Sequence, residues 1–234
     1  MPPRLLKGAN PTPRHLLAAA MPHVATTPTP PQFLWLPKQL NLWGNGMFGD
    51  CCTAEEAFAK ACNFPEIFIP PAKIVKWARN HFVLNGAGLY EVLQLMQTIG
   101  IDHDLVTYKD GPFHSVNWMD VPLLQNAIAQ GPVKIGVASD HLIQVPNIGV
   151  SNGWIATGLP TGDPLDHCIS LAGYGPASWL ATQLGATLPA EIAGDTPMYA
   201  AFTWSTVGLI DPDSVSAITG EAWLRTPTTI SKPD

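Results

Sequence analysis

The chain has 234 residues, of which 46% are hydrophobic and 13% are charged, and its formal net charge at pH 7 is −6. This composition is too apolar for a disordered chain, and an acidic chain without a run of Lys or Arg is not expected to bind nucleic-acid phosphates. No stretch approaches the roughly 20 apolar residues of a membrane span. The 24 prolines and 20 glycines favour short elements and many turns in a single large domain or in two lobes.

Four cysteines are too few for a disulfide scaffold at this length. They are Cys51, Cys52, Cys62 and Cys168, and no two of them form a Cys-x-x-Cys pair. Neither structural disulfides nor a zinc site is therefore expected. Reduced thiols and the lack of a signal-peptide pattern in the first residues favour a cytoplasmic location.

Residues 1–37 contain nine prolines and show no periodicity. The segment Thr26–Pro31 is expected to be extended, because each proline disfavours the helical conformation of the residue before it. We favour a proline-rich N-terminal arm that lies on the surface or is mobile. The alternative is a pro-segment that blocks a cleft.

Helical patterns dominate the first half of the remaining chain. A helix is expected to begin after its N-cap Asp50, a second at Pro70-Pro71, and a third over Leu89–Ile99, where Gly100 ends it. The second half contains a short helix over Val121–Ala129 and then mainly strands. The expected strands are Val133–Ala138, Cys168–Ala172 and Met198–Trp204, with a last strand or turn at Glu221–Leu224. This is an α+β layout with a cleft between the two halves.

The segment Asn45–Cys51 has chemical potential, because it places two glycines and an amide before a cysteine at a helix start. The positive end of the helix dipole favours a thiolate there, and the free N–H groups of the first turn can stabilise a negative oxygen. Cys51 is thus a candidate nucleophile. The alternative is a buried structural cysteine at a glycine-rich turn.

A nucleophilic cysteine needs a base, and His167 has the best context of the seven histidines. It follows Asp166 and opens an apolar run that reads as a strand. A histidine at the start of a buried strand can point into a cleft, although many such residues only complete a core or its rim.

These two segments resemble the two halves of the papain-like cysteine peptidase signature, in a divergent, bacterial or phage type. The family's glutamine, two glycines and catalytic cysteine correspond to Asn45, Gly46, Gly49 and Cys51, and its Asp-His-Ala and Gly-Tyr-Gly motifs correspond to Asp166-His167-Cys168 and Gly173-Tyr174-Gly175. Further matches between residues 38 and 204 are Gly86-Ala87-Gly88, Gly100-Ile101 and Gly131-Pro132-Val133.

The resemblance implies a papain-like two-lobed α+β fold, with the proline-rich arm over 1–37 and the papain-like domain over 38–234. A helical lobe would span about 38–115, and a β-barrel-like lobe would span about 116–234. The active-site cleft would lie between them.

The resemblance also implies a thiol hydrolase that cleaves peptide or amide bonds without a cofactor or metal. Cys51 would form a thioester, His167 would act as general base and acid, and Asn45 with the Cys51 N–H would hold the oxyanion. The substrate-binding residues would be Gly49, Asp50, Gly88, Gly136, Cys168 and Trp204, of which Gly136 and Cys168 would line the pocket for the side chain preceding the scissile residue.

The chain departs from the family pattern at several positions. Asn45 is one methylene shorter than the family's glutamine, Phe48 replaces a cysteine, and Cys52 replaces a tryptophan. If Trp204 is the family's second tryptophan, Phe202 stands where an asparagine should orient the imidazole. Thr203 is then the candidate orienter, although a regular strand would point it the opposite way unless a bulge intervenes.

Other readings stay open. Cys52 could be the nucleophile if the motif slips by one residue, Asp102-His103-Asp104 could bind a metal, and Ser139-Asp140-His141 could mimic a serine triad. The protein could also be an amidase or acyl transferase acting on a non-protein amide, or a catalytically weak or inactive binding or structural module. The missing asparagine favours this last alternative. The sequence does not predict the oligomeric state.

Overall fold

The computed structural model describes residues 5–150, 153–226 and 229–231. Within these ranges the helices are α1 (Arg14–Ala19), α2 (Cys51–Ala61), α3 (Pro71–Asn80), α4 (Leu89–Thr98), α5 (Val121–Gln130), α6 (Ala177–Leu184) and α7 (Pro212–Ile218), with a 3-10 turn at Leu142–Gln144. The strands are β1 (Ala9–Asn10), β2 (Phe33–Leu34), β3 (Ala87–Gly88), β4 (Ile101–His103), β5 (Val106–Lys109), β6 (Phe113–Ser115), β7 (Val133–Val137), β8 (Ile155–Ala156), β9 (His167–Pro176), β10 (Pro197–Thr203), β11 (Thr206–Ile210), β12 (Thr219–Arg225) and β13 (Thr229–Ser231). No helix in the described ranges is both long and apolar enough to cross a membrane.

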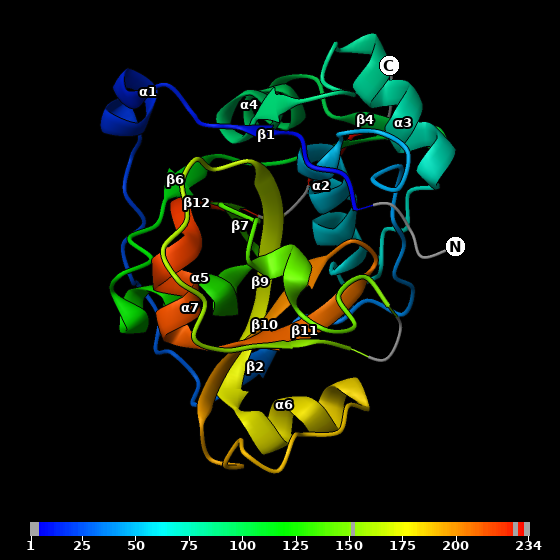
Figure 1. Cartoon of the computed structure of the whole chain (residues 1–234). Helices are drawn as coiled ribbons and strands as arrows, with labels where there is room; N and C mark the ends of the chain where they lie inside the picture. The colour runs from blue at the N-terminus through cyan, green and yellow to red at the C-terminus, as the bar shows by residue number, and fades with distance from the viewer. Residues whose placement is uncertain (1–4, 151–152, 227–228, 232–234) are drawn as a thin grey trace.

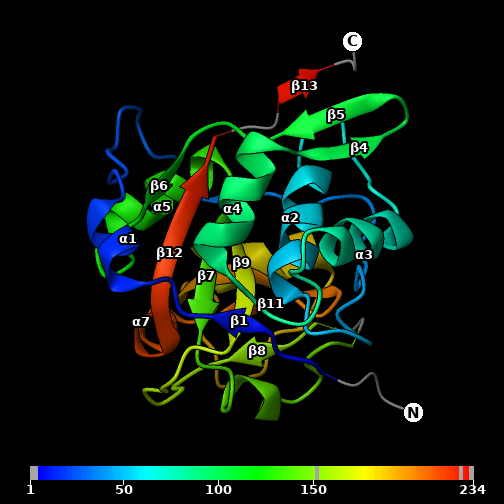
Figure 2. The same ribbon diagram turned by 90° about the horizontal axis from the view of Figure 1, so that it is seen from above.

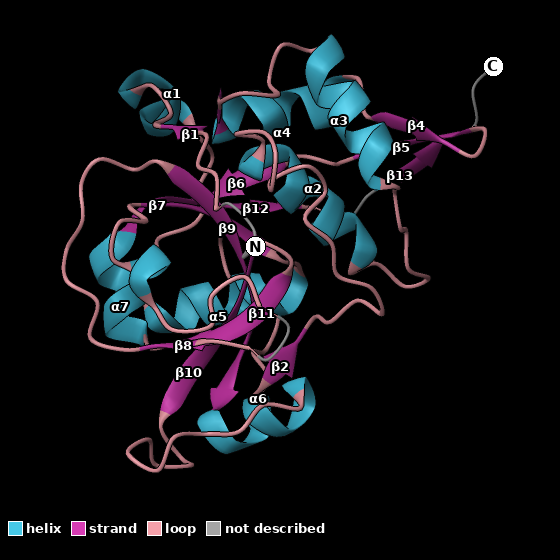
Figure 3. Ribbon diagram, turned by 45° about the vertical axis from the view of Figure 1, so that its right-hand side comes forward, coloured by secondary structure: helices cyan, strands magenta, loops and turns pink. Residues whose placement is uncertain are grey.

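The elements form a mixed α+β fold with two lobes (Figures 1 and 3). Helices α2, α3 and α4 gather on one side and share one apolar core with a face of β9 and β10. The second core lies on the other face of these strands, where α5 and α7 pack. The predicted division into a helical first half and a strand-rich second half is confirmed.

One large sheet dominates the strand-rich lobe. Its strands follow the order β6-β12-β7-β9-β10-β11-β8, and β2 pairs additionally with β9. Most neighbours are antiparallel, but β8 runs parallel to β11. Among the described strands the path is open, with β6 and β8 at its ends, so the barrel-like lobe that the resemblance implied does not close.

The periodic segments fold as predicted, with small shifts at their ends. The helix expected after Asp50 begins at Cys51, but the Asp50 side chain makes no capping hydrogen bond. Its carboxyl group is buried, and this burial raises the pKa of Asp50 to about 8. Strand β9 is longer than the apolar run suggested, because the Gly-Tyr-Gly segment continues the pairing.

The N-terminal arm is more ordered than its composition suggested. It contains the short helix α1 and adds β1 and β2 to strands of the two lobes. Side chains of the main body hold its backbone, since Tyr174 donates a hydrogen bond to the carbonyl of Pro30 and Asn126 donates to that of Thr27. Backbone N–H groups of the arm also donate to the main body, as those of His23 and Trp35 do to the carbonyls of Ser115 and Ala172.

A buried network of charges joins the two lobes. Arg225 of β12 donates hydrogen bonds to Glu55 and Glu56 of α2, and Lys134 of β7 donates to Glu56 at 2.6 Å. Lys60 of α2 forms an ion pair with Asp110 at 2.8 Å. Burial alone would lower the pKa of Lys134, but the carboxylates of Glu56 and Glu55 raise it above its usual range. Each of these buried charges is therefore stabilised by the opposite charges beside it, and removing one would leave a buried charge without a partner.

Candidate active site

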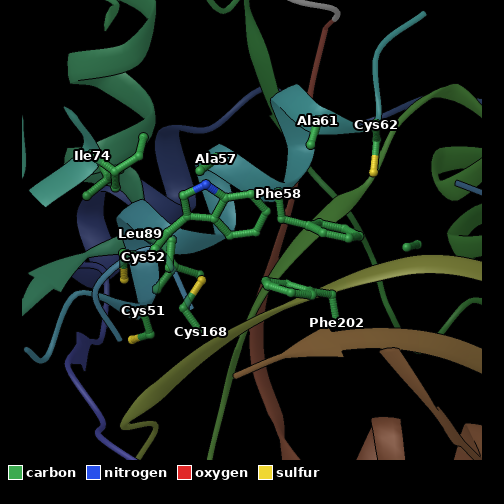
Figure 4. Packing of buried hydrophobic residues seen from close by; sticks show 14 of the residues in the cluster. Cys51, Cys52, Ala57, Phe58, Ala61, Cys62, Ile74, Leu89, Cys168 and Phe202 are labelled. Atoms are coloured by element: carbon green, nitrogen blue, oxygen red, sulfur yellow. The ribbon is translucent and has the colours of Figure 1, made fainter. Parts of the chain in front are cut away.

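Cys51 occupies the first position of α2, where the helix dipole and free N–H groups act on it. It is 2% exposed. Its neighbours are thiols: Cys52 contacts both Cys51 and Cys168, and Cys168 is the second residue of β9. Figure 4 shows the three side chains gathered at this end of α2. The contact between Cys52 and Cys168 brings the start of α2 against the start of β9. Cys51 precedes Cys52 in the chain, and His167 precedes Cys168, so both candidate residues lie next to this contact.

His167 is fully buried at the start of β9. Its Nε2 lies 2.8 Å from the hydroxyl oxygen of Thr203. Its Nδ1 is also buried and has no hydrogen-bond partner among the described residues. Burial lowers the pKa of His167 to about 3, against a smaller opposing effect of Asp166. The imidazole is therefore neutral at physiological pH, with one ring nitrogen held and the other free to accept a proton.

A β-bulge explains why Thr203, and not Phe202, meets the imidazole. The pairing of β10 with β9 shifts by one residue between Ala200 and Ala201, so that Ala172 of β9 is left without an opposite residue. A one-residue shift exchanges the faces of all following residues. Beyond the bulge, Phe202 faces α2 and stacks on Phe58 with ring centroids 4.1 Å apart (Figure 4), while Thr203 shares the face of His167.

Trp204 covers the other side of the imidazole. Its ring stacks on that of His167 with a centroid distance of 4.0 Å and an interplanar angle of 12°. Trp204 and Ser205 form the tight turn between β10 and β11, and both have positive φ, 42° and 72°. Glycine and asparagine normally fill such a turn. The strained conformation places the indole over His167, as strained residues at functional sites often do.

Part of the N-terminal arm lies in this site. The carbonyl oxygen of Leu6 accepts hydrogen bonds from Asn45 Nδ2 at 3.2 Å and from Trp204 Nε1 at 3.0 Å. Two N–H donors from different lobes therefore converge on one carbonyl oxygen, next to the imidazole on which Trp204 stacks. Both donors are thus satisfied by a main-chain carbonyl of the arm.

The next residues of the arm continue through the site. The N–H groups of Gly8 and Ala9 both donate to the carbonyl of Asp166, at 3.1 and 3.0 Å. Lys7 forms ion pairs with Asp140 and Asp166. Strand β1 then pairs in parallel with β3, and crosses the molecule beside the start of α4 (Figure 2). The arm thus binds the site as an extended peptide would.

The fit of the arm requires glycine at position 8. A Cβ atom on Gly8 would lie 1.8 Å from the carbonyl oxygen of Gly49, and one on Gly49 would lie 2.6 Å from that of Lys7. The backbone of the arm and the backbone at Gly49 therefore lie so close that neither position can carry a side chain.

The other predicted substrate residues are placed as follows. Gly88 pairs with Asn10 of the arm, and Gly136 lies beneath Leu165, whose Cδ1 would be 2.3 Å from a Cβ there. Asp50 is buried beside Gly44, and the Cys168 thiol faces Cys52.

The structure does not support the serine-triad and metal-site alternatives. Ser139 donates its hydroxyl hydrogen bond to Asp166 at 2.8 Å, and Asp140 pairs with Lys7, so the serine-triad reading has no relay in the structure. No cluster of three or more His, Cys, Asp or Glu side chains in the described ranges could hold a metal ion, and this includes the segment of His103.

Sequence reasoning missed two features of the site. It gave Trp204 as a substrate-binding residue but did not predict that its indole N–H donates a hydrogen bond to the arm. It also did not connect Leu6 with the site, because a single carbonyl in an arm without periodicity leaves no pattern. The glycines at positions 8 and 49 are the signal that could have suggested a close backbone approach, but the sequence does not show that they face each other.

The fold is that of papain-like cysteine proteases of known structure. Three solved structures with this fold are similar to the chain. Xylellain, a cysteine protease from Xylella fastidiosa, has a TM-score of 0.62 at 14% identity, with 96% of this chain and 98% of that chain covered. The proform of Amb a 11, a cysteine protease and major ragweed pollen allergen, has a TM-score of 0.61 at 14% identity, covering 91% and 72%. The Carica candamarcensis cysteine protease CMS1MS2 has a TM-score of 0.55 at 15% identity, covering 85% and 99%. Neither a protein-family model nor a curated protein matches the sequence.

Proposed function

We propose that this chain is a papain-like thiol hydrolase that cleaves peptide or amide bonds through a thioester on Cys51. The observation that carries the proposal is the state of His167. Thr203 holds one ring nitrogen, Trp204 stacks on the ring, and the other ring nitrogen is free. A general base works only if its proton-accepting nitrogen is held toward the nucleophile, and these contacts fix the orientation of the ring.

In the proposed reaction, the Cys51 sulfur attacks the carbonyl carbon of the substrate and its proton passes to Nδ1 of His167. The carbonyl oxygen becomes an oxyanion held by Asn45 Nδ2, by Trp204 Nε1 and by the N–H of Cys51. His167 then gives the proton to the leaving amine as the C–N bond breaks, which leaves the thioester. Water, deprotonated by the same imidazole, hydrolyses the thioester and restores the thiol.

The N-terminal arm is part of the proposal. With Leu6 in the place of the substrate carbonyl, residues 5–12 exclude substrate, and the enzyme would act only after they move. Residues 1–37 are then a pro-segment that blocks the cleft, the alternative to a surface arm. Water admitted by its departure would remove the cause of the low pKa of His167, namely burial. We place the enzyme in a reducing compartment such as the cytoplasm, since the four thiols are free.

An inactive binding or structural module is the second candidate, favoured by the replacement of the orienting asparagine and by the low pKa of His167. An amidase or acyl transferase would use the same dyad on a different amide. These candidates differ in whether Cys51 is reactive once the cleft is open.

The test uses the full-length chain with Gly8→Ala, which cannot keep the arm against Gly49. We expect iodoacetamide near pH 6 to alkylate Cys51 rapidly in this variant and slowly in the unchanged chain, as located by mass spectrometry. Val24→Ala, an exposed position of the same arm, is the matched control and should behave like the unchanged chain.

Hydrolysis of a peptide library should appear with Gly8→Ala and vanish when Cys51→Ala is added. Alkylation of Gly8→Ala only above pH 8, or equally at all four cysteines, would favour the inactive module. Hydrolysis that survives Cys51→Ala would exclude the mechanism.

A further inference from the structure

Three of the four thiols gather where α2 begins. Cys52, the second residue of α2, is in hydrogen-bond contact with Cys168, the second residue of β9, and also contacts Cys51. Figure 4 shows these three side chains together, with Cys62 at the other end of the helix. All three are at most 3% exposed. No group of three or more His, Cys, Asp or Glu side chains in the described part of the chain could hold a metal ion, and this includes the three thiols.

The two thiols that meet across the lobes both replace residues of the family pattern. Cys52 stands where the family has a tryptophan, and Cys168 stands where it has an alanine. The two replacements lie far apart in the sequence and are in contact in the structure. The pair is therefore a property of this chain and not of the fold that it shares with other proteins.

The backbone decides which of the three thiols can bond to each other. A disulfide needs Cα atoms about 4.4 to 6.8 Å apart. Cys51 and Cys52 are consecutive residues of α2, and the Cα atoms of neighbours are only about 3.8 Å apart across a trans peptide. They cannot bond while the helix is intact. Cys52 and Cys168 lie on different elements with their thiols already in contact, so this pair is the one placed to form an S–S bond.

Lys134 of β7 favours the reactive form of this pair. Its ammonium group donates a hydrogen bond to the carbonyl of Cys52 at 2.7 Å. Burial raises the pKa of the Cys168 thiol, and the positive charge of Lys134 opposes this effect. The thiolate is the species that attacks in disulfide chemistry, so a buried cation beside the two thiols assists the reaction.

We propose that Cys52 and Cys168 are a redox-active pair, which a peroxide oxidises to a disulfide between α2 and β9. The thiolate sulfur of one cysteine attacks a peroxide oxygen, the O–O bond breaks, hydroxide leaves, and the sulfur becomes a sulfenic acid. The thiolate of the other cysteine attacks this sulfur, the S–O bond breaks, and a second hydroxide leaves. With the two thiol protons, two thiols and one hydrogen peroxide give one disulfide and two waters. Two equivalents of a small thiol reverse the reaction.

The disulfide would join the two lobes beside the candidate catalytic residues. Cys51 and His167 each precede one of the bonded residues, and the reaction consumes neither of them. The bond closes the long loop between residues 52 and 168, so it restricts the unfolded chain and stabilises the folded one. The inference goes beyond the proposed function and does not depend on it, because the bond forms without a substrate.

The test maps the bond in the full-length chain. The reduced protein is treated with an excess of hydrogen peroxide at pH 8, its remaining thiols are alkylated with iodoacetamide, and its peptides are analysed by mass spectrometry without reduction. We expect the peptide that contains Cys52 to be linked to the peptide that contains Cys168. Because Cys51 shares a peptide with Cys52, Cys51→Ala shows which of them is linked, and it should form the same link. Cys168→Ala should not form it, whereas the matched control Cys62→Ala should.

Thermal unfolding measures the consequence of the bond. We expect the oxidised chain to have a Tm about 5 to 15 °C above that of the reduced chain, as closure of a long loop in a chain of this size would produce. Dithiothreitol should remove the difference. In Cys168→Ala, peroxide should produce no rise in Tm.

Oxidation of the cysteines to sulfinic acid without any link, or a link that vanishes in Cys51→Ala, would overturn the redox-active pair. If a variant does not fold, fragmentation of the linked peptide of the unchanged chain between residues 51 and 52 decides the question. A link between Cys52 and Cys168 in a chain that hydrolyses no peptide would overturn the proposed hydrolase and leave the pair standing. The two proposals therefore fail in different measurements.

Discussion

The imidazole of His167 and the hydroxyl of Thr203 meet at 2.8 Å although they lie on different strands and Thr203 has no sequence signature of its own. Their meeting depends on the bulge at Ala172, which turns Thr203 and not Phe202 toward β9's first residue. The Thr203 hydroxyl reaches the imidazole through a shorter side chain than that of the asparagine expected from the family pattern.

Replacing Thr203 by Val tests this relationship. Val has nearly the same shape but no hydroxyl, so His167 Nε2 would be buried without a partner and the imidazole would lose its orientation. In the Gly8→Ala background we expect kcat on a cleaved peptide to fall about tenfold to a hundredfold, with a smaller change in KM. Thr203→Ser keeps the hydroxyl and should retain most of the rate. Equal rates for the Val and Ser variants would show that the hydroxyl does not orient the base.

The arm can be loosened at its charged anchor as well as at Gly8. Lys7 pairs with Asp140 and Asp166, and all three side chains are partly exposed, so the pairs are weak. Lys7→Met should therefore accelerate alkylation of Cys51 by about twofold to tenfold, which corresponds to roughly 0.4 to 1.4 kcal/mol. Raising the ionic strength should accelerate alkylation in the unchanged chain and have little effect in the variant, because salt screens exposed pairs. A variant that alkylates at the original rate would indicate that Lys7 does not hold the arm.

Local signals in the sequence were sufficient for the main elements. The helices α2, α3 and α4 each carry an apolar stripe and an end signal, and β7, β9 and β10 carry apolar runs, so their positions follow from residue pattern. The resemblance at Cys51 and His167 likewise depends on short motifs.

Features that depend on contacts between distant residues could not be read in this way. The bulge at Ala172 changes which residue faces His167, but a run of apolar residues looks the same with or without it. The carbonyl of Leu6 carries no side-chain information at all. Glu221 lies in the segment assigned as a last strand or turn, and nothing in that segment predicts its hydrogen bond with the backbone N–H of Thr12.

The low pKa of His167 predicts a pH dependence of folding. The unfolded chain protonates this histidine near its ordinary pKa of about 6.5, whereas the folded chain does so only near 3. Between these values the unfolded state binds more protons, so the folded state loses stability as the pH falls, by at most about 1.4 kcal/mol per pH unit from this group. Above pH 6.5 the histidine is neutral in both states, so its titration does not reduce the stability of the folded state there.

Urea unfolding at pH 4.5, 5.5 and 7 measures this effect. His167→Gln cannot titrate, so the free energy of unfolding should decline less steeply with acid in the variant than in the unchanged chain. His15→Gln, at an exposed position of α1, is the control and should keep the steeper decline. Parallel curves for all three proteins would mean that His167 is accessible to protons in the folded state.

The buried charges between the lobes give a prediction on stability. Arg225 donates to both Glu55 and Glu56, so Arg225→Met leaves two buried carboxylates with only lysine partners. Breaking a buried pair by removing one partner costs about 3 to 5 kcal/mol. We expect a loss of that size in the free energy of unfolding measured with urea. Arg79→Met, at an exposed position of α3, removes the same charge and should change it by less than about 0.5 kcal/mol. A double variant in which Glu55→Gln is added to Arg225→Met should recover part of the loss, because one uncompensated charge is removed, and a further loss of stability would contradict the charge-based explanation.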